Sequence, residues 1–179
     1  MTKEEMKALR RTIKKDKKYL RFREMFEGNP AFSIDFESYH EELQRLHTTR
    51  HTRQLRRKSK GFTESVVDAM LQDQATRSRC VEMLGECIKI SSSMEDTLVN
   101  LRDYLLSEFS QQLKRVGTQT ERKSFVESVM MPFYEYISDV QTLEKSARLV
   151  VDDIDKAGYT YRNLVEAIKI LSRPEQVSL

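Results

Sequence analysis

Apolar residues recur with the spacing of helices along almost the whole chain. From Val129 to Ala157 they alternate steps of four and three, a heptad pattern typical of a helix that packs along a neighbour at a shallow angle. No segment alternates apolar and polar residues for long enough to indicate a strand, and hairpin dipeptides are absent. The pattern predicts an all-α fold of about six helices, with bundle-like or coiled-coil-like packing.

The first third of the chain is predicted to form two helices. The pair Thr2 and Glu5 has the spacing of a capping box, which predicts a helix over residues 2–27. The second helix is predicted over residues 35–61. One stripe of this second helix begins apolar at Phe36 and becomes basic in its second half.

A third helix is predicted from residue 63 onward. The serines at 91–93 are expected to break it, and a continuous helix over residues 63–116 is the open alternative because serine does not forbid helix. Its expected buried face consists of Val67, Leu71, Val81, Leu84 and Ile88.

The heptad pattern belongs to a long helix predicted over residues 119–157 and opened by a second capping pair, Thr118 and Glu121. Pro132 either kinks this helix or begins a new one. Gly158 is expected to end it, before a last short helix. Four heptad positions are predicted to hold helix packing or an oligomer together: Val140, Leu143, Val150 and Ile154.

Composition supports long helices and narrows the class of protein. Of the 179 residues a third are charged, while only five are Gly and three are Pro. The chain has no run of about 18 apolar residues, so no membrane span is expected. Its opening residues, MTKEEMKALRR, contain no apolar segment of the kind found in a signal peptide, so no signal peptide is expected either. Cys80 and Cys87, seven residues apart, are too distant for a mutual disulfide on one helix. Reduced thiols favour a cytoplasmic, nucleoid or nuclear location.

The charge is unevenly distributed between two parts of the chain. Residues 1–60 hold 17 Lys and Arg against 9 Asp and Glu, whereas residues 61–179 hold 14 against 19. We therefore predict a protruding basic helical arm over residues 1–61 and a helical body over residues 62–179. Such asymmetry favours a polyanionic partner or self-association between unlike halves.

Basic side chains in the predicted arm are stacked at successive helical turns. Arginine suits bidentate contact with phosphate, and a merely solvated surface usually mixes charges of both signs. The alternatives are a solvated or protein-bound basic face and an anionic membrane surface. The residues predicted to contact nucleic-acid phosphates are Lys7, Arg11, Lys14, Lys15, Lys18, Arg21, Arg50, Arg53, Arg56, Arg57, Lys58 and Lys60.

Other chemistry-bearing residues give weaker patterns. The three histidines and the two cysteines lack the further ligands that a zinc site needs, so no metal or other cofactor is expected. Asp152, Asp153 and Asp155 lie near the end of a predicted helix, where carboxylates are electrostatically unfavourable. Contact with a basic face, in the same molecule or in a neighbour, explains this cluster. A magnesium-dependent phosphohydrolase would need a second carboxylate cluster, which no pattern selects.

These patterns together predict a protein that is not an enzyme. No phosphate-binding glycine loop, nucleophile elbow or metalloprotease motif is present. We expect a non-enzymatic, nucleic-acid-associated accessory or assembly protein that contacts the phosphate backbone through its basic N-terminal region. The alternative is an oligomeric helical scaffold or adaptor that binds acidic protein partners.

Overall fold

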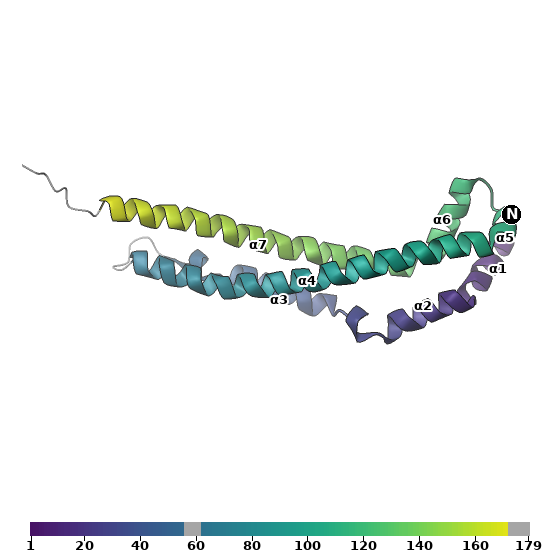
Figure 1. The fold of residues 1–179 in the computed structure, drawn as a ribbon, viewed down its shortest axis with the longest axis horizontal. Helices are drawn as coiled ribbons and strands as arrows, with labels where there is room; N and C mark the ends of the chain where they lie inside the picture. The colour runs from purple at the N-terminus through teal and green to yellow at the C-terminus, as the bar shows by residue number, and fades with distance from the viewer. Residues whose placement is uncertain (56–61, 172–179) are drawn as a thin grey trace, which may run out of the picture. The chain divides into compact units, whose positions relative to one another are not determined.

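The computed structural model describes residues 1–55 and 62–171, and within these ranges it contains helices and no strands (Figure 1). The predicted all-α class is therefore confirmed. The elements are α1 (Lys3–Lys14), α2 (Lys17–Gly28), the 3₁₀ helix η1 (Pro30–Phe32), α3 (Phe36–Thr48), the 3₁₀ helix η2 (His51–Gln54), α4 (Phe62–Glu108), α5 (Ser110–Leu113), α6 (Gln119–Val129) and α7 (Met131–Leu171).

Two helices begin at the capping pairs that the sequence indicates. Glu5 accepts a hydrogen bond from the backbone of Thr2 at 2.7 Å, and the Thr2 hydroxyl accepts one from Glu5 at 3.2 Å. Thr118 and Glu121 form the same reciprocal arrangement at the start of α6. Pro132 lies in the first turn of α7, where its missing N–H would have no helical partner, so it begins a new helix.

The first predicted helix is wrong, because residues 2–27 form two helices. Asp16 ends the continuity: its Oδ1 atom accepts hydrogen bonds from the backbone of Lys18 at 2.8 Å and of Tyr19 at 3.2 Å. Asp16 is therefore the N-cap of α2. The basic residues that are stacked at successive turns in the predicted helix are therefore divided between α1 and α2.

The second predicted helix is also wrong in its extent. α3 ends at Thr48, and Arg50 adopts a non-helical conformation, with ψ of 131°, as the N-cap of η2. The register that links Phe36 to Arg50 in the sequence therefore does not continue through a single helix. Residues 56–61 lie outside the described residues.

Two expected helix breaks do not occur. α4 continues through the serines at 91–93, and α7 continues through Gly158 to Leu171. A serine or glycine costs only about 0.5–1 kcal/mol relative to alanine in a helix. Burial of apolar residues on either side of each position outweighs that cost.

The buried face of α4 differs from the predicted one. Val67, Leu71, Val81 and Ile88 are 41–66% exposed, and Leu84 is half-buried. Over residues 66–87 the buried face instead carries smaller or polarisable side chains together with one carboxylate. It includes Val66, Ala69, Asp73, Cys80, Met83 and Cys87.

The chain divides into two compact units. Unit 1 comprises residues 1–35 and 87–142, and unit 2 comprises residues 36–86 and 143–179. Each unit draws residues from both sides of the predicted boundary at residue 61. The most N-terminal helices contribute core residues to unit 1, since Leu9 and Ile13 of α1 are buried.

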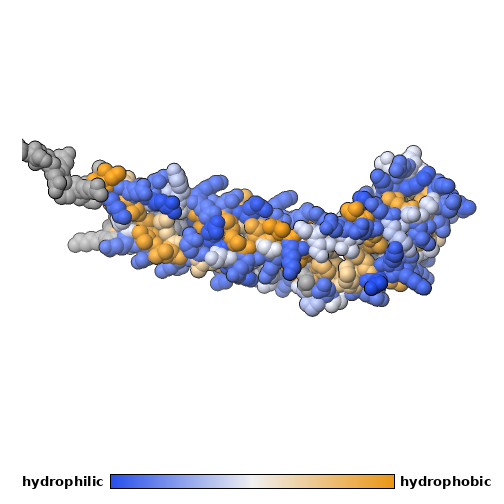
Figure 2. Space-filling model, in the orientation of Figure 1, coloured by the Kyte–Doolittle hydropathy of each residue, from blue (hydrophilic) through white to orange (hydrophobic). Residues whose placement is uncertain are grey.

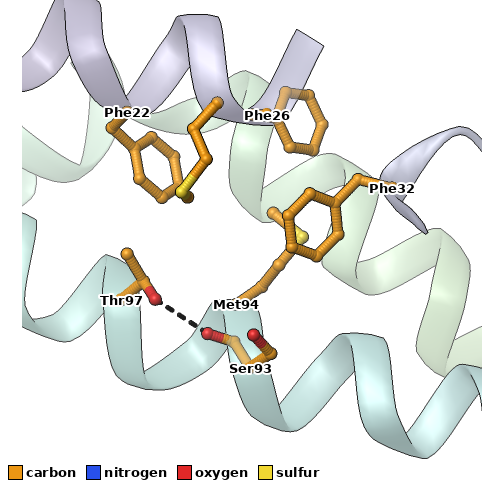
Figure 3. A pocket seen from close by; sticks show the side chains of 7 residues that line it. Phe22, Phe26, Phe32, Ser93, Met94 and Thr97 are labelled. Atoms are coloured by element: carbon orange, nitrogen blue, oxygen red, sulfur yellow. Dashed lines mark hydrogen bonds between the residues drawn. The ribbon is translucent and has the colours of Figure 1, made fainter. Parts of the chain in front are cut away.

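Aromatic rings form much of the core of unit 1. The ring centroid of Phe133 lies 5.8 Å from that of Tyr19, 4.8 Å from that of Phe22 and 5.3 Å from that of Phe26. Figure 3 shows Phe22, Phe26 and Phe32 around Met94 of α4. The space that these side chains enclose does not admit a water molecule, so they act as packing residues.

The predicted heptad positions are buried within one chain. Leu143, Val150 and Ile154 are at most 8% exposed in unit 2, and Val140 is fully buried in unit 1. Their packing role is clear, but they present no apolar surface to a second molecule. Across the described ranges, no helix combines the length and the apolar character required to cross a membrane.

Candidate nucleic-acid interface

The cations of α1 lie on the side of the helix opposite its buried residues. Leu9 and Ile13 are buried, whereas Lys7, Arg11 and Lys14 are exposed. At about 100° per residue, these three cations centre on the face opposite Leu9 and Ile13. Burial of the apolar face in unit 1 therefore turns the basic face outward.

The following residues extend this positive surface to α2. Lys15 caps the C-terminus of α1, and Lys18 and Arg21 lie on α2, all exposed. The Tyr104 hydroxyl donates a hydrogen bond to Asp16 Oδ2 at 3.2 Å, and Lys18 Nζ lies 3.8 Å from the centroid of the Tyr104 ring. The N-cap of α2 thus also fixes the position of one cation.

None of the six predicted cations of this region has an ion-pair partner among the described residues. We call this group the α1–α2 basic surface. Its members are Lys7, Arg11, Lys14, Lys15, Lys18 and Arg21.

Further cations that the prediction omitted border the same surface. Lys3, Arg10 and Lys17 are exposed, and Arg10 donates a hydrogen bond to Ser128 Oγ at 3.0 Å. Two shallow grooves adjoin these side chains. One, of about 210 Å³, includes Lys3, Lys7 and Arg10 in its lining, and the other, of about 490 Å³, includes Lys18 and Arg21.

Arg50, predicted to contact phosphate, is instead a buried residue of unit 2. It is 1% exposed, and its Nε atom lies 3.3 Å from Asp73 Oδ2. Its Nη1 atom donates to Asp153 Oδ2, and its Nη2 atom donates to Thr52 Oγ1 at 3.3 Å. The prediction for Arg50 is therefore wrong, because carboxylates from α4 and α7 already neutralise it.

Arg53 forms a second ion pair with Asp153 in the same network. Its Nη2 atom donates to Asp153 Oδ2 at 2.9 Å and lies 2.6 Å from His47 Nε2. The guanidinium is still 44% exposed, but its charge has a partner. Arg53, predicted to contact phosphate, is therefore already paired with a carboxylate of α7.

The same network holds η2 in place between two helices of unit 2. Asp73 accepts hydrogen bonds from the backbone N–H of His51 at 2.9 Å and from the Thr52 hydroxyl at 2.6 Å. The Tyr161 hydroxyl of α7 donates to the carbonyl of Thr52 at 3.2 Å. These contacts explain why the chain leaves helical geometry after α3 and why Arg50 turns inward.

Two of the three clustered aspartates near the end of α7 contact arginines of the same chain. Asp153 accepts from Arg50 and Arg53, and Asp155 accepts two hydrogen bonds from Arg77 at 2.7 and 3.1 Å. The explanation by contact with a basic face of the same molecule is confirmed for these two residues. Among the described residues, no group of three or more His, Cys, Asp or Glu side chains is placed to hold a metal ion.

The positive neighbours of Asp153 shift its titration. Partial burial alone would raise the pKa of this carboxyl, but the hydrogen bond from Arg53 and the charges of Arg50 and Arg53 outweigh it and hold the pKa below its ordinary value. A carboxyl whose pKa is lower in the folded state stabilises the fold above its unfolded pKa of about 3.9. That contribution is lost as the pH falls from about 4 through the lower folded value.

This linkage predicts that Asp153→Asn will change the acid sensitivity of the protein. The variant is expected to have a lower urea midpoint than the original protein at pH 6, and the gap should shrink at pH 3. Asp152→Asn is the matched control, because Asp152 is exposed and forms no ion pair with any residue in the described ranges. A gap of constant size between pH 6 and pH 3 would contradict the assignment.

Four of the residues predicted to contact phosphate are not described by the structure, and one residue of the Arg50 network was not predicted. Arg56, Arg57, Lys58 and Lys60 lie outside the described residues. The unpredicted residue is Asp73, the buried partner of Arg50. The sequence contains one signal for it: Asp73 is a lone carboxylate on the same face of α4 as Val66 and Cys80. A charged residue that is buried among apolar residues requires a partner.

The fold and this surface define an all-α protein with a solvent-exposed basic surface on its first two helices. No protein-family model, curated protein or solved structure matches the chain.

Proposed function

We propose that the protein is a non-enzymatic, nucleic-acid-associated accessory or assembly protein whose α1–α2 basic surface binds the phosphate backbone. The observation that carries this proposal is a contrast between two groups of basic residues. The six cations of the α1–α2 basic surface are exposed without carboxylate partners among the described residues, whereas Arg50 and Arg53 are paired. Only the first group is available to an external polyanion.

The chemistry of this surface favours backbone contact over base stacking. Tyr19 and Phe22, the aromatic residues within the basic segment, are 3% and 6% exposed. Lysine and arginine side chains neutralise phosphates and release condensed counterions irrespective of base sequence. We therefore propose binding that depends strongly on salt and weakly on base sequence.

The contribution of individual cations is tested by substituting two neighbours on the exposed face of α1. Arg11→Gln with Lys14→Gln is expected to weaken binding to a mixed-sequence duplex and to reduce the magnitude of the log–log salt slope by about 2, since each phosphate contact contributes about 0.9. Fluorescence anisotropy at several salt concentrations measures both quantities.

The matched control removes the same charge from another part of the chain. Lys145→Gln with Lys156→Gln changes two exposed cations of α7 in unit 2 and is expected to leave the slope unchanged. If both double variants reduce the slope equally, net charge alone accounts for binding. The proposed location of the interface would then be wrong.

A further inference from the structure

α4 has apolar residues on two opposite faces within unit 2. One face contains Val66, Cys80 and Met83, which are fully buried. The other contains Val67 and Leu71, which are 44% and 66% exposed. A surface helix normally has one apolar face and one polar face, so the second apolar face indicates a contact with another molecule.

The exposed face follows a heptad repeat. We call its six positions the α4 stripe; all are exposed, and they alternate steps of four and three. Steps of this kind place side chains in one seam that packs against a second helix at a shallow angle. Ile88 and Val99, the other exposed large apolar residues of α4, belong to unit 1 and keep the same spacing in sequence. The α4 stripe consists of Val67, Leu71, Gln74, Ser78, Val81 and Gly85.

Small residues of the stripe permit close approach of a second backbone. Ser78 and Gly85 alternate with larger side chains, and a Cβ atom added at Gly85 would meet nothing within 4 Å. A glycine within a helix costs about 1 kcal/mol relative to alanine. Close helix contact at this position would explain the presence of a glycine without strain or crowding inside the chain.

An adjoining groove widens the apolar surface at the start of α4. The groove holds about 330 Å³, and its apolar lining includes Val67, Met70 and Leu71 of α4 and Val165 of α7. Figure 2 shows hydrophobic side chains gathered over the first turns of α4. This part of unit 2 therefore offers more apolar contact area than the α4 stripe alone.

We infer that a second copy of this chain packs along the α4 stripe, with the two α4 helices parallel and in register. In that arrangement Arg77 of one copy faces Glu82 of the other, and symmetry forms the pair twice. Glu82 is 65% exposed, and within its own chain its Oε2 atom lies 3.5 Å from Arg79 Nη1. Arg77 uses Nε and Nη2 for Asp155, so its Nη1 atom can face the partner. An antiparallel pair would instead bring the acidic positions Asp68 and Glu82 of the two copies to the same side.

Self-association is tested by light scattering coupled to size exclusion, without nucleic acid. The unmodified protein is expected to approach twice the 21.1 kDa of one chain as concentration rises. Leu71→Glu with Val81→Glu places charges in the seam and should restore the mass of one chain. Glu82→Lys should weaken the dimer by opposing Arg77, with unchanged helical circular dichroism.

The control is an exposed leucine elsewhere in unit 2. Leu149 is 68% exposed on α7, and Leu149→Glu should leave the dimer intact. The inference is overturned by a protein that stays monomeric up to about 100 μM, or by a dimer that survives Leu71→Glu with Val81→Glu. Loss of the dimer in Leu149→Glu would overturn it as well. The absence of nucleic acid keeps these outcomes separate from the proposed binding function.

Discussion

Replacing Asp73 by alanine is expected to lower the free energy of unfolding by about 3–5 kcal/mol. The change leaves Arg50, which is 1% exposed, without one of its two carboxylate partners, and it removes the acceptor for the His51 backbone and the Thr52 hydroxyl. Arg50 then keeps only Asp153, a partly exposed partner, so much less of the desolvation cost of its buried charge is offset. Urea unfolding followed by circular dichroism measures the loss.

Two comparisons separate this effect from a general loss of charge. Asp68→Ala removes an exposed carboxylate from the same helix and should change stability by less than about 0.5 kcal/mol. Arg50→Met combined with Asp73→Leu removes both charges and should be less destabilising than Asp73→Ala, because apolar residues of similar size can replace a buried ion pair. An equal loss in Asp73→Ala and Asp68→Ala would contradict the assignment of Arg50 as a buried ion-pair residue.

Replacing Phe133 by alanine is expected to cost about 3–5 kcal/mol in unit 1. The Phe133 side chain is 3% exposed and contacts the rings of Tyr19, Phe22 and Phe26. Truncation removes apolar burial and leaves a cavity among rings that cannot collapse fully. The free energy of unfolding from a urea titration gives the loss directly.

A neighbouring residue supplies the control for Phe133. Met131 begins α7 and is 51% exposed, so Met131→Ala should change stability by less than about 0.5 kcal/mol. Phe133→Leu should lie between the two, because leucine retains part of the buried volume. A loss of less than about 1 kcal/mol in Phe133→Ala would contradict the central packing role of this ring.

Local signals in the sequence predicted the helical class and several helix starts. Thr2 and Thr118 determine their helices through contacts three residues away, so spacing alone identifies them. Asp16 caps α2 inside a segment whose basic residues keep a helical spacing without a break, so that spacing predicts a single helix there. The serines at 91–93 and Gly158 do not break their helices, because packing of distant residues outweighs a small local preference.

The basic residues of the predicted interface differ in the same way: some are placed by nearby residues and others by residues far away in the sequence. Lys7 and Arg11 are exposed because Leu9 and Ile13 on the same helix are buried, a relation that the sequence contains. Arg50 is neutralised by residues 23 and 103 positions away in the chain. Periodicity near Arg50 gives no information on such partners, and therefore it could not distinguish a phosphate contact from a buried ion pair.

The α1–α2 basic surface and the α4 stripe have connected consequences for binding. Two copies joined along α4 would carry two basic surfaces, and the second would bind at a high effective concentration once the first is engaged. Weak phosphate contacts would then give appreciable affinity without sequence-specific base recognition.

The salt dependence of binding by the unmodified protein tests the central claim most directly. With the six cations of the α1–α2 basic surface on phosphates, a plot of log association constant against log salt concentration for duplex DNA should have a slope of about −5 per chain. A slope near zero, or no binding to DNA or RNA at about 50 mM salt, would show that these exposed cations do not bind the phosphates of a nucleic acid.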